Sequence, residues 1–262
     1  SSSGTTSSGG TASGTAGSTS NGGCPNASQN STVSALPGFQ ICQLIPATTK
    51  ANHPDNVVVS GRDLFIGFQN ITAKDGGDTK TSTIGQYTID GKLVKSWTVR
   101  GHTDGMRVDP STHLLWVMCN EDGSPRLFTI DTSSSTPTEI TLPATPHGGG
   151  FDDIFFINGL ALIDASAPVL NKAGINVFPA LYKVQLSGTK AVLTPVLMGN
   201  AAADTAKPPV TTTSLNLTDP DSMTMTPQGD LLLDDQGDNM FVLIHGVGTP
   251  QQKVKVLTVG TQ

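Results

Sequence analysis

The sequence predicts an all-β fold made of repeated four-stranded units, and three observations carry this prediction. Glycine and proline are abundant, with 29 and 17 copies in 262 residues, and such residues suit a chain of short strands and many turns. No long segment keeps a helical period of apolar residues without an interrupting Gly, Pro or Thr. Finally, a short motif that contains an aspartate appears in four copies along the chain.

Residues 1–32 hold almost no apolar side chains, so we expect a disordered Ser/Gly/Thr-rich tether ahead of a domain that spans residues 33–262. Such a segment cannot bury enough surface to offset the entropy lost on ordering. Because the chain starts with a serine, we expect it to be processed. The tether resembles the spacer of a bacterial lipoprotein, with a lipid anchor upstream of Ser1, and it equally fits a secreted protein after signal cleavage. Both interpretations predict export, to the periplasm, the cell surface or the extracellular space.

Cysteine usage fits an exported protein better than a metal centre. Cys24 and Cys42 are expected to form a disulfide that joins the end of the tether to the first strand, which leaves Cys119 as a buried thiol. The sequence has no C-x-x-C motif, so a structural zinc site is not expected.

The repeated motif places an aspartate third, followed in most copies by a turn-like or small polar residue and then by a strand. Its four copies are HPDNVVV from residue 53, HTDGMRV from 102, GFDDIFF from 150 and DPDSMTM from 219. The aligned aspartates are Asp55, Asp104, Asp152 and Asp221, at separations of 49, 48 and 69 residues. The longer last interval contains residues 199–219, which we expect to form a loop insertion.

Three further strands are expected after each copy of the motif. The second strands are LFIGF, LLWVM, LALID and LLLDD, and the third strands are STIGQYTID, PRLFTID, PALYKVQL and NMFVLIHG. The fourth strands are KLVKSWTV, TEITLP, AVLTPVLMG and KVKVLTVG. Four strands in each unit of about 45 to 50 residues predict the four-stranded antiparallel blades of a β-propeller.

Four whole blades are visible, and one further strand at residues 39–46 (FQICQLIP) precedes them in the place of an outer strand. Propellers usually close by pairing such a strand with inner strands from the other end of the chain. We therefore expect the parent protein to have five or more blades, with the domain truncated or incomplete at its C-terminus. If residue 262 is the natural end, either four blades close on themselves or the exposed edges pair with another chain.

Charge and motif content exclude several classes of function. The net charge of −6 leaves no basic stripe to neutralise phosphates, so nucleic acid is not an expected partner. No apolar run approaches the roughly 20 residues that span a bilayer, so no transmembrane segment is expected. The sequence also lacks a G-x-S-x-G nucleophile motif, a phosphate-binding P-loop and a dinucleotide-binding fingerprint.

The repeated turn and strand pattern over residues 39–262 resembles that of NHL-repeat and gluconolactonase-like β-propellers. The segments that carry this resemblance are HPDNVVV, HTDGMRVDPSTHLLWV, NGLALIDAS and DPDSMTMTPQGDLLLDD. Gluconolactonase-like propellers hold a divalent cation in the central channel through a glutamate, asparagines and an aspartate. The resemblance implies Asn56, Asn120 and Asp221 as the matching ligands, whereas residues 39–46 contain no glutamate to match.

The loops that enter the first strand and leave the second strand of each blade should open on one face, where acidic side chains and histidines gather. The candidate metal ligands are His53, His102, His147, Asp55, Asp104, Asp152 and Asp221. Further candidates for a ligand-binding face are Asn120, Glu121, Asp122, Asp153, Asp234 and Asp235. Oxygen-rich sites suit Ca²⁺ or Mg²⁺, whereas histidines favour Zn²⁺ or another transition metal.

Each candidate also has a structural explanation. The aligned aspartates occur in every blade, so they could serve the common fold by bonding backbone N–H groups of their own turns. Histidines in turns commonly bond neighbouring backbone, and the DDQGDN segment at 234–239 fits a tight polar turn. Four carboxylates that point into a dry channel would repel one another, so an inward orientation requires a cation or water.

Two functions from different classes follow from these features. The first is an exported, non-catalytic binding or scaffold module whose Asp- and His-rich face takes a protein or small-molecule ligand, with Ca²⁺ or another divalent cation in a structural role. The alternative is a metal-dependent hydrolase or lyase of gluconolactonase-like or NHL-like type, in which the metal polarises a substrate oxygen or activates water.

Overall fold

The computed structural model describes residue 37 and residues 44–260. The predicted tether at residues 1–32 and the predicted disulfide between Cys24 and Cys42 lie outside the described residues. All strands of the described residues lie in the compact unit Ala47–Gln262.

Twelve strands form three sheets of four strands each. The first sheet contains β1 (Pro54–Ser60), β2 (Asp63–Phe68), β3 (Thr81–Thr88) and β4 (Leu93–Arg100). The second contains β5 (Thr103–Val108), β6 (Leu115–Cys119), β7 (Arg126–Ile130) and β8 (Thr138–Ile140). The third contains β9 (Gly150–Ile157), β10 (Leu160–Ser166), β11 (Pro179–Ser187) and β12 (Lys190–Met198). All neighbouring strands in these sheets are antiparallel and follow chain order, which confirms the predicted blades.

The fourth sheet differs from the other three because it has six strands. Its blade consists of β15 (Pro220–Met225), β16 (Leu231–Asp235), β17 (Met240–His245) and β18 (Lys253–Thr258). Two more strands, β13 (Ala202–Thr205) and β14 (Thr212–Ser214), come from the expected loop insertion, so that expectation was wrong in part. The edge of β18 offers unpaired backbone groups, and β13 pairs with it in parallel while β14 folds back as a Thr-rich hairpin.

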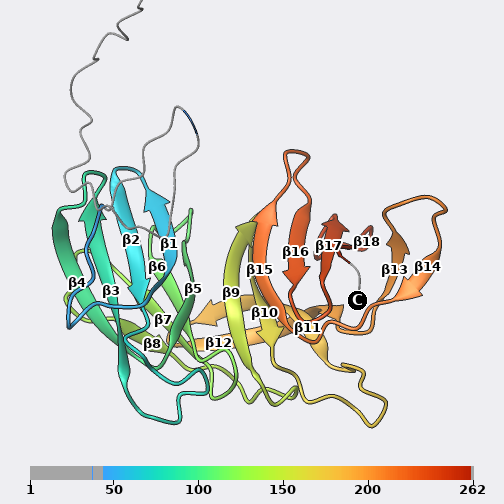
Figure 1. Ribbon diagram of the computed structural model, residues 1–262, viewed down its shortest axis with the longest axis horizontal. Helices are drawn as coiled ribbons and strands as arrows, with labels where there is room; N and C mark the ends of the chain where they lie inside the picture. Colours follow the sequence, from blue (N-terminus) through green and yellow to red (C-terminus); the bar gives the residue numbers. More distant parts are fainter. Residues whose placement is uncertain (1–36, 38–43, 261–262) are drawn as a thin grey trace, which may run out of the picture. The chain divides into compact units, whose positions relative to one another are not determined.

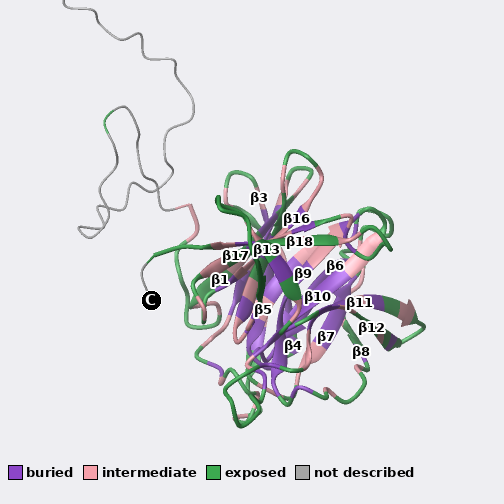
Figure 2. Cartoon of the chain, turned by 90° about the vertical axis from the view of Figure 1, so that its right-hand side faces the viewer, coloured by how far each residue is buried: buried purple, intermediate pink, exposed green. Residues whose placement is uncertain are grey.

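The innermost strands of consecutive blades, β1, β5, β9 and β15, contact one another in that order, as the blades of a β-propeller do (Figure 1). Three hydrophobic clusters lie between the blades, and each joins two consecutive ones. Trp97 belongs to the cluster between the first and second blades, Phe151 to the next, and Leu233 to the last. Figure 2 shows the buried residues concentrated on the strands of the blades. The core of the domain is therefore the set of interfaces between blades.

Side chains alternate in burial along the innermost strand of the first blade. Val58 is 7% exposed because it faces the second blade, whereas Val57 and Val59 on the opposite side are 59% and 63% exposed. Phe241 of the fourth blade is also exposed. Within the described part of the chain, the three clusters link consecutive blades only, and the expectation of further blades stays a prediction.

A β-bulge recurs at the start of all four innermost strands. In each blade, two residues of this strand oppose a single residue of the second strand, and the first of the two is the aligned aspartate. The four bulges are at 55–56, 104–105, 152–153 and 221–222. Bulges bend a strand and re-aim its side chains, so this repeated irregularity sets where the aspartates point.

Polar and small residues support these bulges. The amide of Asp153 donates to Asp164 Oδ1 at 2.7 Å, and the amide of Ser222 donates to Asp234 Oδ1 at 2.8 Å. Gly105 in the second bulge lies against the backbone carbonyl of Asp152, and a Cβ atom there would clash with it. Glycine at this position therefore allows the second and third blades to approach closely beside the aligned aspartates.

Candidate functional site

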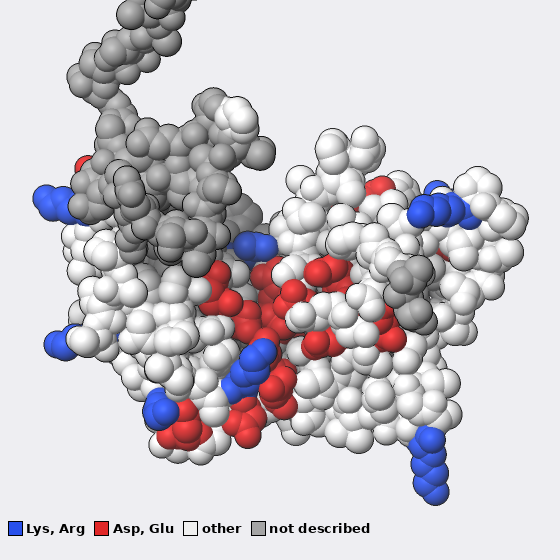
Figure 3. Space-filling model, viewed as in Figure 1, with Lys and Arg blue, Asp and Glu red and all other residues white. Residues whose placement is uncertain are grey.

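The bulges bring the aligned aspartates together with other carboxyl groups. The carboxyl of Asp104 lies in hydrogen-bonding contact with those of Asp55, Asp152 and Glu121. Asp152 lies beside Asp164 and Asp221 as well. We call the group made of Asp55, Asp104, Glu121, Asp152, Asp164 and Asp221 the acid cluster. Figure 3 shows acidic side chains gathered in the middle of the face that it displays.

One end of the acid cluster combines two carboxyl groups with a histidine. His102, Asp104 and Glu121 each present one ligand atom, and these three atoms lie within 4.8 Å of one another. His102 directly precedes β5, Asp104 begins its bulge, and Glu121 follows β6. The hairpin of β5 and β6 thus supplies all three groups.

Hydrogen bonds fix the orientation of the His102 ring. Its Nδ1 lies 2.9 Å from the carbonyl oxygen of Thr72 and 3.0 Å from the Thr72 hydroxyl. A carbonyl oxygen can only accept, so Nδ1 carries a hydrogen, and Nε2 is the ring nitrogen that is available as a ligand atom in this tautomer. His102 is 5% exposed, and its Nε2 has no hydrogen-bond partner among the described residues. The ring therefore presents a buried, unused lone pair.

Burial and like charge keep several of these carboxyls protonated. Desolvation raises the pKa of Asp104 to about 10, and contact with Glu121 and Asp55 adds to this effect. Desolvation and the neighbouring carboxyl group of Asp104 raise the pKa of Asp152. Asp164 is fully buried, and its pKa is raised by burial and by Asp153. The Oδ2 atoms of Asp152 and Asp164 have no hydrogen-bond partner in the described part of the chain.

Lys74 supplies a positive charge at this end of the cluster. Its ammonium group forms an ion pair with Glu121, although the lysine side chain is 60% exposed. Burial alone would raise the pKa of Glu121, but contacts with Asp104 and Lys74 outweigh it and lower that pKa. Contact with Glu121 in turn raises the pKa of Lys74. Glu121 is thus the ionised member of the trio, and Asp104 holds a proton.

Backbone contacts hold the trio in place. The side-chain oxygen of Asn120 accepts the amide of His102 at 2.8 Å, and the amide of Gly150 donates to the carbonyl oxygen of Glu121 at 3.0 Å. Asp235 makes the equivalent contact in the fourth blade, where it accepts the amide of Asp219 at 3.2 Å. Because the contact recurs, Asn120 and Asp235 serve the fold as braces between the first and second strands.

The predicted face residues outside the trio have other surroundings. His53 is exposed, and its Nδ1 lies 2.7 Å from the side-chain oxygen of its neighbour Asn52. His147 is fully buried, and its Nε2 donates to the carbonyl oxygen of Gly150 at 2.8 Å while its ring packs against Phe151. Burial lowers the pKa of His147. The structure therefore does not bring these two histidines to the trio.

The remaining predicted residues lie around the acid cluster or beside it. Asp122 is exposed, and its amide donates to the carbonyl oxygen of Lys74 at 3.2 Å. Asp234 supports the fourth bulge, and burial raises the pKa of Asp235 to about 7. Sequence reasoning missed Thr72 and Lys74, which come from the loop between β2 and β3 and belong to no repeated motif.

Cys119 lies at the end of β6 as a buried free thiol. Desolvation raises its pKa, and the nearby carboxyl group of Asp104 adds to this effect. Because the thiolate is the reactive form, this cysteine is not an activated nucleophile. The described residues also include no helix of the length and apolarity needed to cross a membrane.

Comparisons with known proteins give distant structural similarity only. No protein-family model matches the chain, and a search of curated proteins finds no significant relative. Among solved structures, it is similar to a protein of unknown function from Bacteroides caccae, at 14% identity and a TM-score of 0.43 over 87% of this chain and 65% of the other. It is also similar to virginiamycin B lyase from Staphylococcus aureus, at 12% identity and a TM-score of 0.46 over 82% of this chain and 72% of the other. The chain thus spans about two thirds of the first structure's length.

Proposed function

We propose that this chain is a non-catalytic binding module that holds a divalent cation at His102, Asp104 and Glu121, on the polar face of its propeller. The observation that carries the proposal is the Nε2 atom of His102, which is buried and has no partner among the described residues, beside two carboxyl groups. A buried acceptor left unpaired costs about 1–3 kcal/mol. A bound cation would remove this cost and relieve the repulsion between the carboxyls.

The contacts behind His102 support this proposal. Metal-binding histidines usually donate their other N–H to a carbonyl or carboxylate, which fixes the ring and its tautomer. The Nδ1–H of His102 makes this bond to the carbonyl oxygen of Thr72. Asp104 would lose its proton when the cation binds, and Glu121 would exchange Lys74 for the cation.

The donor set favours particular ions. One imidazole and two carboxylates suit Zn²⁺ or Mn²⁺ better than Ca²⁺, which prefers six or more oxygen ligands. Three protein ligands would leave coordination positions open. An anionic group of a partner or small molecule could take these positions, so the cation would link the polar face to its ligand.

Calorimetric titration of metal-stripped protein with Zn²⁺, Mn²⁺ and Ca²⁺ tests the proposal. We expect one equivalent of Zn²⁺ or Mn²⁺ to bind to the wild type. His102→Ala and Asp104→Asn should each weaken binding at least tenfold, since each removes a ligand. Matched controls are His53→Ala, which changes the exposed histidine, and Asp122→Asn, which changes the exposed neighbour of Glu121. Both controls should bind as the wild type does.

Other results would overturn the assignment. Failure of all three ions to bind at millimolar concentration contradicts the site. Binding that His102→Ala leaves unchanged places the cation elsewhere in the acid cluster. Circular dichroism of each variant shows whether the fold is intact, and Asp104→Asn preserves the size of the side chain if His102→Ala proves unstable.

A metal-dependent hydrolase or lyase is the second candidate, and the open coordination positions favour it. A cation with a free position can activate water or polarise a substrate oxygen. In this candidate His102 and Asp104 hold the cation, and Glu121 is an ionised carboxylate beside it that accepts a proton instead of binding the metal. Assays of the Zn²⁺- and Mn²⁺-loaded protein against sugar lactones, with the Glu121→Gln variant in parallel, separate the two candidates. Turnover that Glu121→Gln abolishes while the cation stays bound supports the enzyme, and metal binding without turnover supports the binding module.

A further inference from the structure

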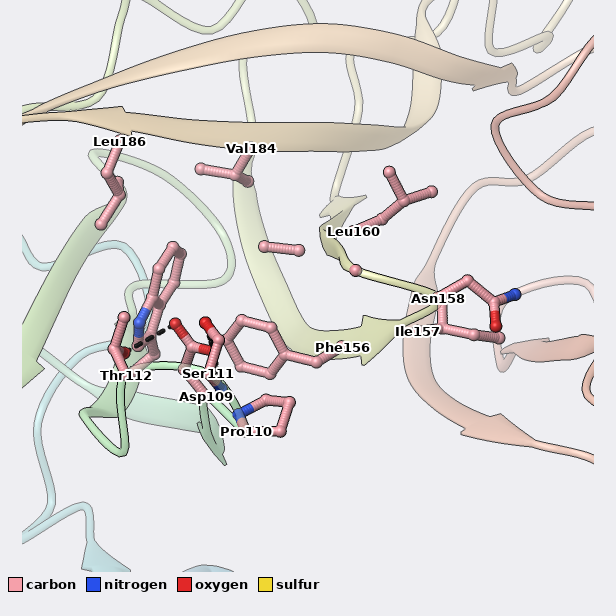
Figure 4. Close-up of a pocket in the computed structure, with 13 residues that line it drawn as sticks. Asp109, Pro110, Ser111, Thr112, Phe156, Ile157, Asn158, Leu160, Val184 and Leu186 are labelled. Atoms are coloured by element: carbon pink, nitrogen blue, oxygen red, sulfur yellow. Dashed lines mark hydrogen bonds between the residues drawn. The ribbon is translucent and has the colours of Figure 1, made fainter.

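A pocket lies between the second and third blades, at the end of the strands away from the acid cluster. It is formed around the turn from β5 to β6 and the turn from β9 to β10, whereas the aligned aspartates stand at the beginning of β5 and β9. The pocket encloses about 310 Å³, a volume at the lower end of the range of about 300–1,000 Å³ that small-molecule sites span. In Figure 4, Leu160, Val184 and Leu186 lie on one side of it, and Ser111 and Thr112 lie on another.

A buried donor without an acceptor lines this pocket. Trp116 is 4% exposed, its ring meets that of Phe156 edge to face at 5.3 Å, and its Nε1–H has no acceptor among the described residues. Trp97 is similarly buried, but its Nε1–H donates to the carbonyl oxygen of Ser134 at 2.8 Å. Buried indole N–H groups usually find a partner. The unpaired donor therefore marks a position for an acceptor from outside the chain.

The polar wall of the pocket indicates the charge of the ligand. The carboxylate of Asp109 accepts the Ser111 amide at 2.8 Å, the Ser111 hydroxyl at 2.7 Å and the Thr112 hydroxyl at 2.7 Å. Burial raises the pKa of Asp109, but these hydrogen bonds outweigh it and lower that pKa. The negative charge of Asp109 would repel an anionic ligand. Its oxygens already accept three hydrogen bonds from the turn, so they do not need a cationic ligand. A neutral ligand is therefore favoured.

We propose that this pocket binds a neutral small molecule that combines an aromatic or compact aliphatic body with one acceptor oxygen. The body packs against Phe156, Leu160 and Val184, and the oxygen accepts the hydrogen bond from Trp116 Nε1. The site shares no residue with the proposed cation site and goes beyond that function. The two sites can therefore be tested independently.

Nuclear magnetic resonance of ¹⁵N-labelled protein tests the proposal with two probes of similar size. Acetophenone carries a carbonyl acceptor, and ethylbenzene lacks one. The chain has two tryptophans, so two indole N–H signals are expected, and the spectrum of Trp116→Phe assigns them. Acetophenone should shift the Trp116 signal saturably and leave the Trp97 signal in place, because that N–H is already bonded to Ser134. Ethylbenzene should bind three- to tenfold more weakly, since one neutral hydrogen bond contributes about 0.5–1.5 kcal/mol.

Two variants complete the test. Trp116→Phe keeps an aromatic ring but removes the donor, so it should bind acetophenone and ethylbenzene with equal affinity. Ala161→Leu should fill the pocket and abolish binding of both probes, whereas Trp97→Phe should bind as the wild type does. Equal shifts of both indole signals, or acetophenone binding that survives Ala161→Leu, would overturn the proposal. The wild-type shifts and Ala161→Leu keep it falsifiable if Trp116→Phe does not fold.

Discussion

Asp152 and Asp153 stand side by side in the bulge of the third blade, yet their surroundings are opposite. Asp153 accepts the amides of Ile154 and Met223 at 2.8 and 2.9 Å, and Arg107 lies 3.1 Å from its carboxylate. Asp152 faces the carboxyls of Asp104 and Asp164, and its Oδ2 has no hydrogen-bond partner among the described residues.

The contrast shows that a buried carboxyl with a structural role in this fold is compensated by a cation and by hydrogen-bond donors. Burial raises the pKa of Asp153 only to about 6, because Arg107 and the two amides favour its charged form. Through these contacts Asp153 joins β9 to β5 and β15. Asp152 has no such compensation, so stability alone does not explain its burial among other carboxyl groups. This difference supports a ligand role for the acid cluster.

The largest expected effect of the uncompensated carboxyls is a decrease in the free energy of unfolding as the pH rises. Asp104 has a pKa of about 10 in the folded protein and that of Asp152 is also raised, whereas an unfolded aspartate titrates near about 3.9. Between these limits the folded chain binds more protons than the unfolded chain, so the free energy of unfolding falls as pH rises. From about pH 7 to 9 we expect a loss of about 1.4 kcal/mol per pH unit for each carboxyl that stays protonated. Urea denaturation of metal-stripped protein measures this slope.

Groups whose pKa values are lowered in the folded protein do not change the slope of stability between pH 7 and 9. Asp109 and Asp131 have lowered pKa values and are ionised in both states above about pH 5, and His147 is neutral in both states above about pH 7.5. Asp152→Asn should reduce the slope by the contribution of one carboxyl group. The matched control, Asp204→Asn on the exposed part of β13, should leave the slope unchanged. A stability that increases from pH 7 to 9 would contradict the raised pKa values.

The second prediction concerns Asp153, whose charge is compensated by Arg107. Removing this arginine should bring the surroundings of Asp153 closer to those of Asp152. Arg107→Met leaves the Asp153 carboxylate buried without its cation, and we expect a loss of about 3 kcal/mol in the free energy of unfolding. This is the lower end of the range for buried pairs, because the Arg107 side chain is 29% exposed. The matched control is Arg126→Met, whose partner Glu139 is 43% exposed, and it should cost at most about 1 kcal/mol. Equal losses for both variants would show that Asp153 does not depend on Arg107.

A smaller effect is expected at the exposed end of the acid cluster. Lys74→Met removes the charge that competes with a cation for Glu121. On the proposed function, Zn²⁺ or Mn²⁺ affinity should increase about fivefold, which corresponds to about 1 kcal/mol of repulsion removed. Lys80→Met, on the same loop but paired with Asp78, should bind the cation as the wild type does. Weaker binding to Lys74→Met would show that the lysine supports the site.

Much of the fold could be predicted because strand periodicity and turn residues are local properties. The segment LLLDD coincides with β16 (Leu231–Asp235), and the aligned aspartates do begin the innermost strands. The β13–β14 hairpin was missed because β14 pairs with β13, and β13 in turn pairs with β18, which lies about fifty residues later in the chain. The bulges were also missed, because the aspartate that comes first in all four of them is equally common in ordinary turns and so does not by itself indicate a bulge.

The site was predictable as a collection of residues but not as a geometry. His53 and His102 have the same place in the motif, yet only His102 meets the carbonyl group of Thr72. The β2–β3 loop provides that carbonyl and also Lys74, and the repeated motif includes no residue of this loop. Which histidine faces the acid cluster is therefore decided by a long-range contact that motif alignment does not contain.

The repeated bulge has a consequence for engineering. A bulge leaves its extra residue outside the ladder, so a new side chain there breaks no strand pairing. Residues 55, 104, 152 and 221 all hold this position. Introducing histidine, cysteine or asparagine at these positions in chosen combinations would present new donor sets within the acid cluster while the blades keep their register. The propeller therefore offers a ready frame for designing metal selectivity.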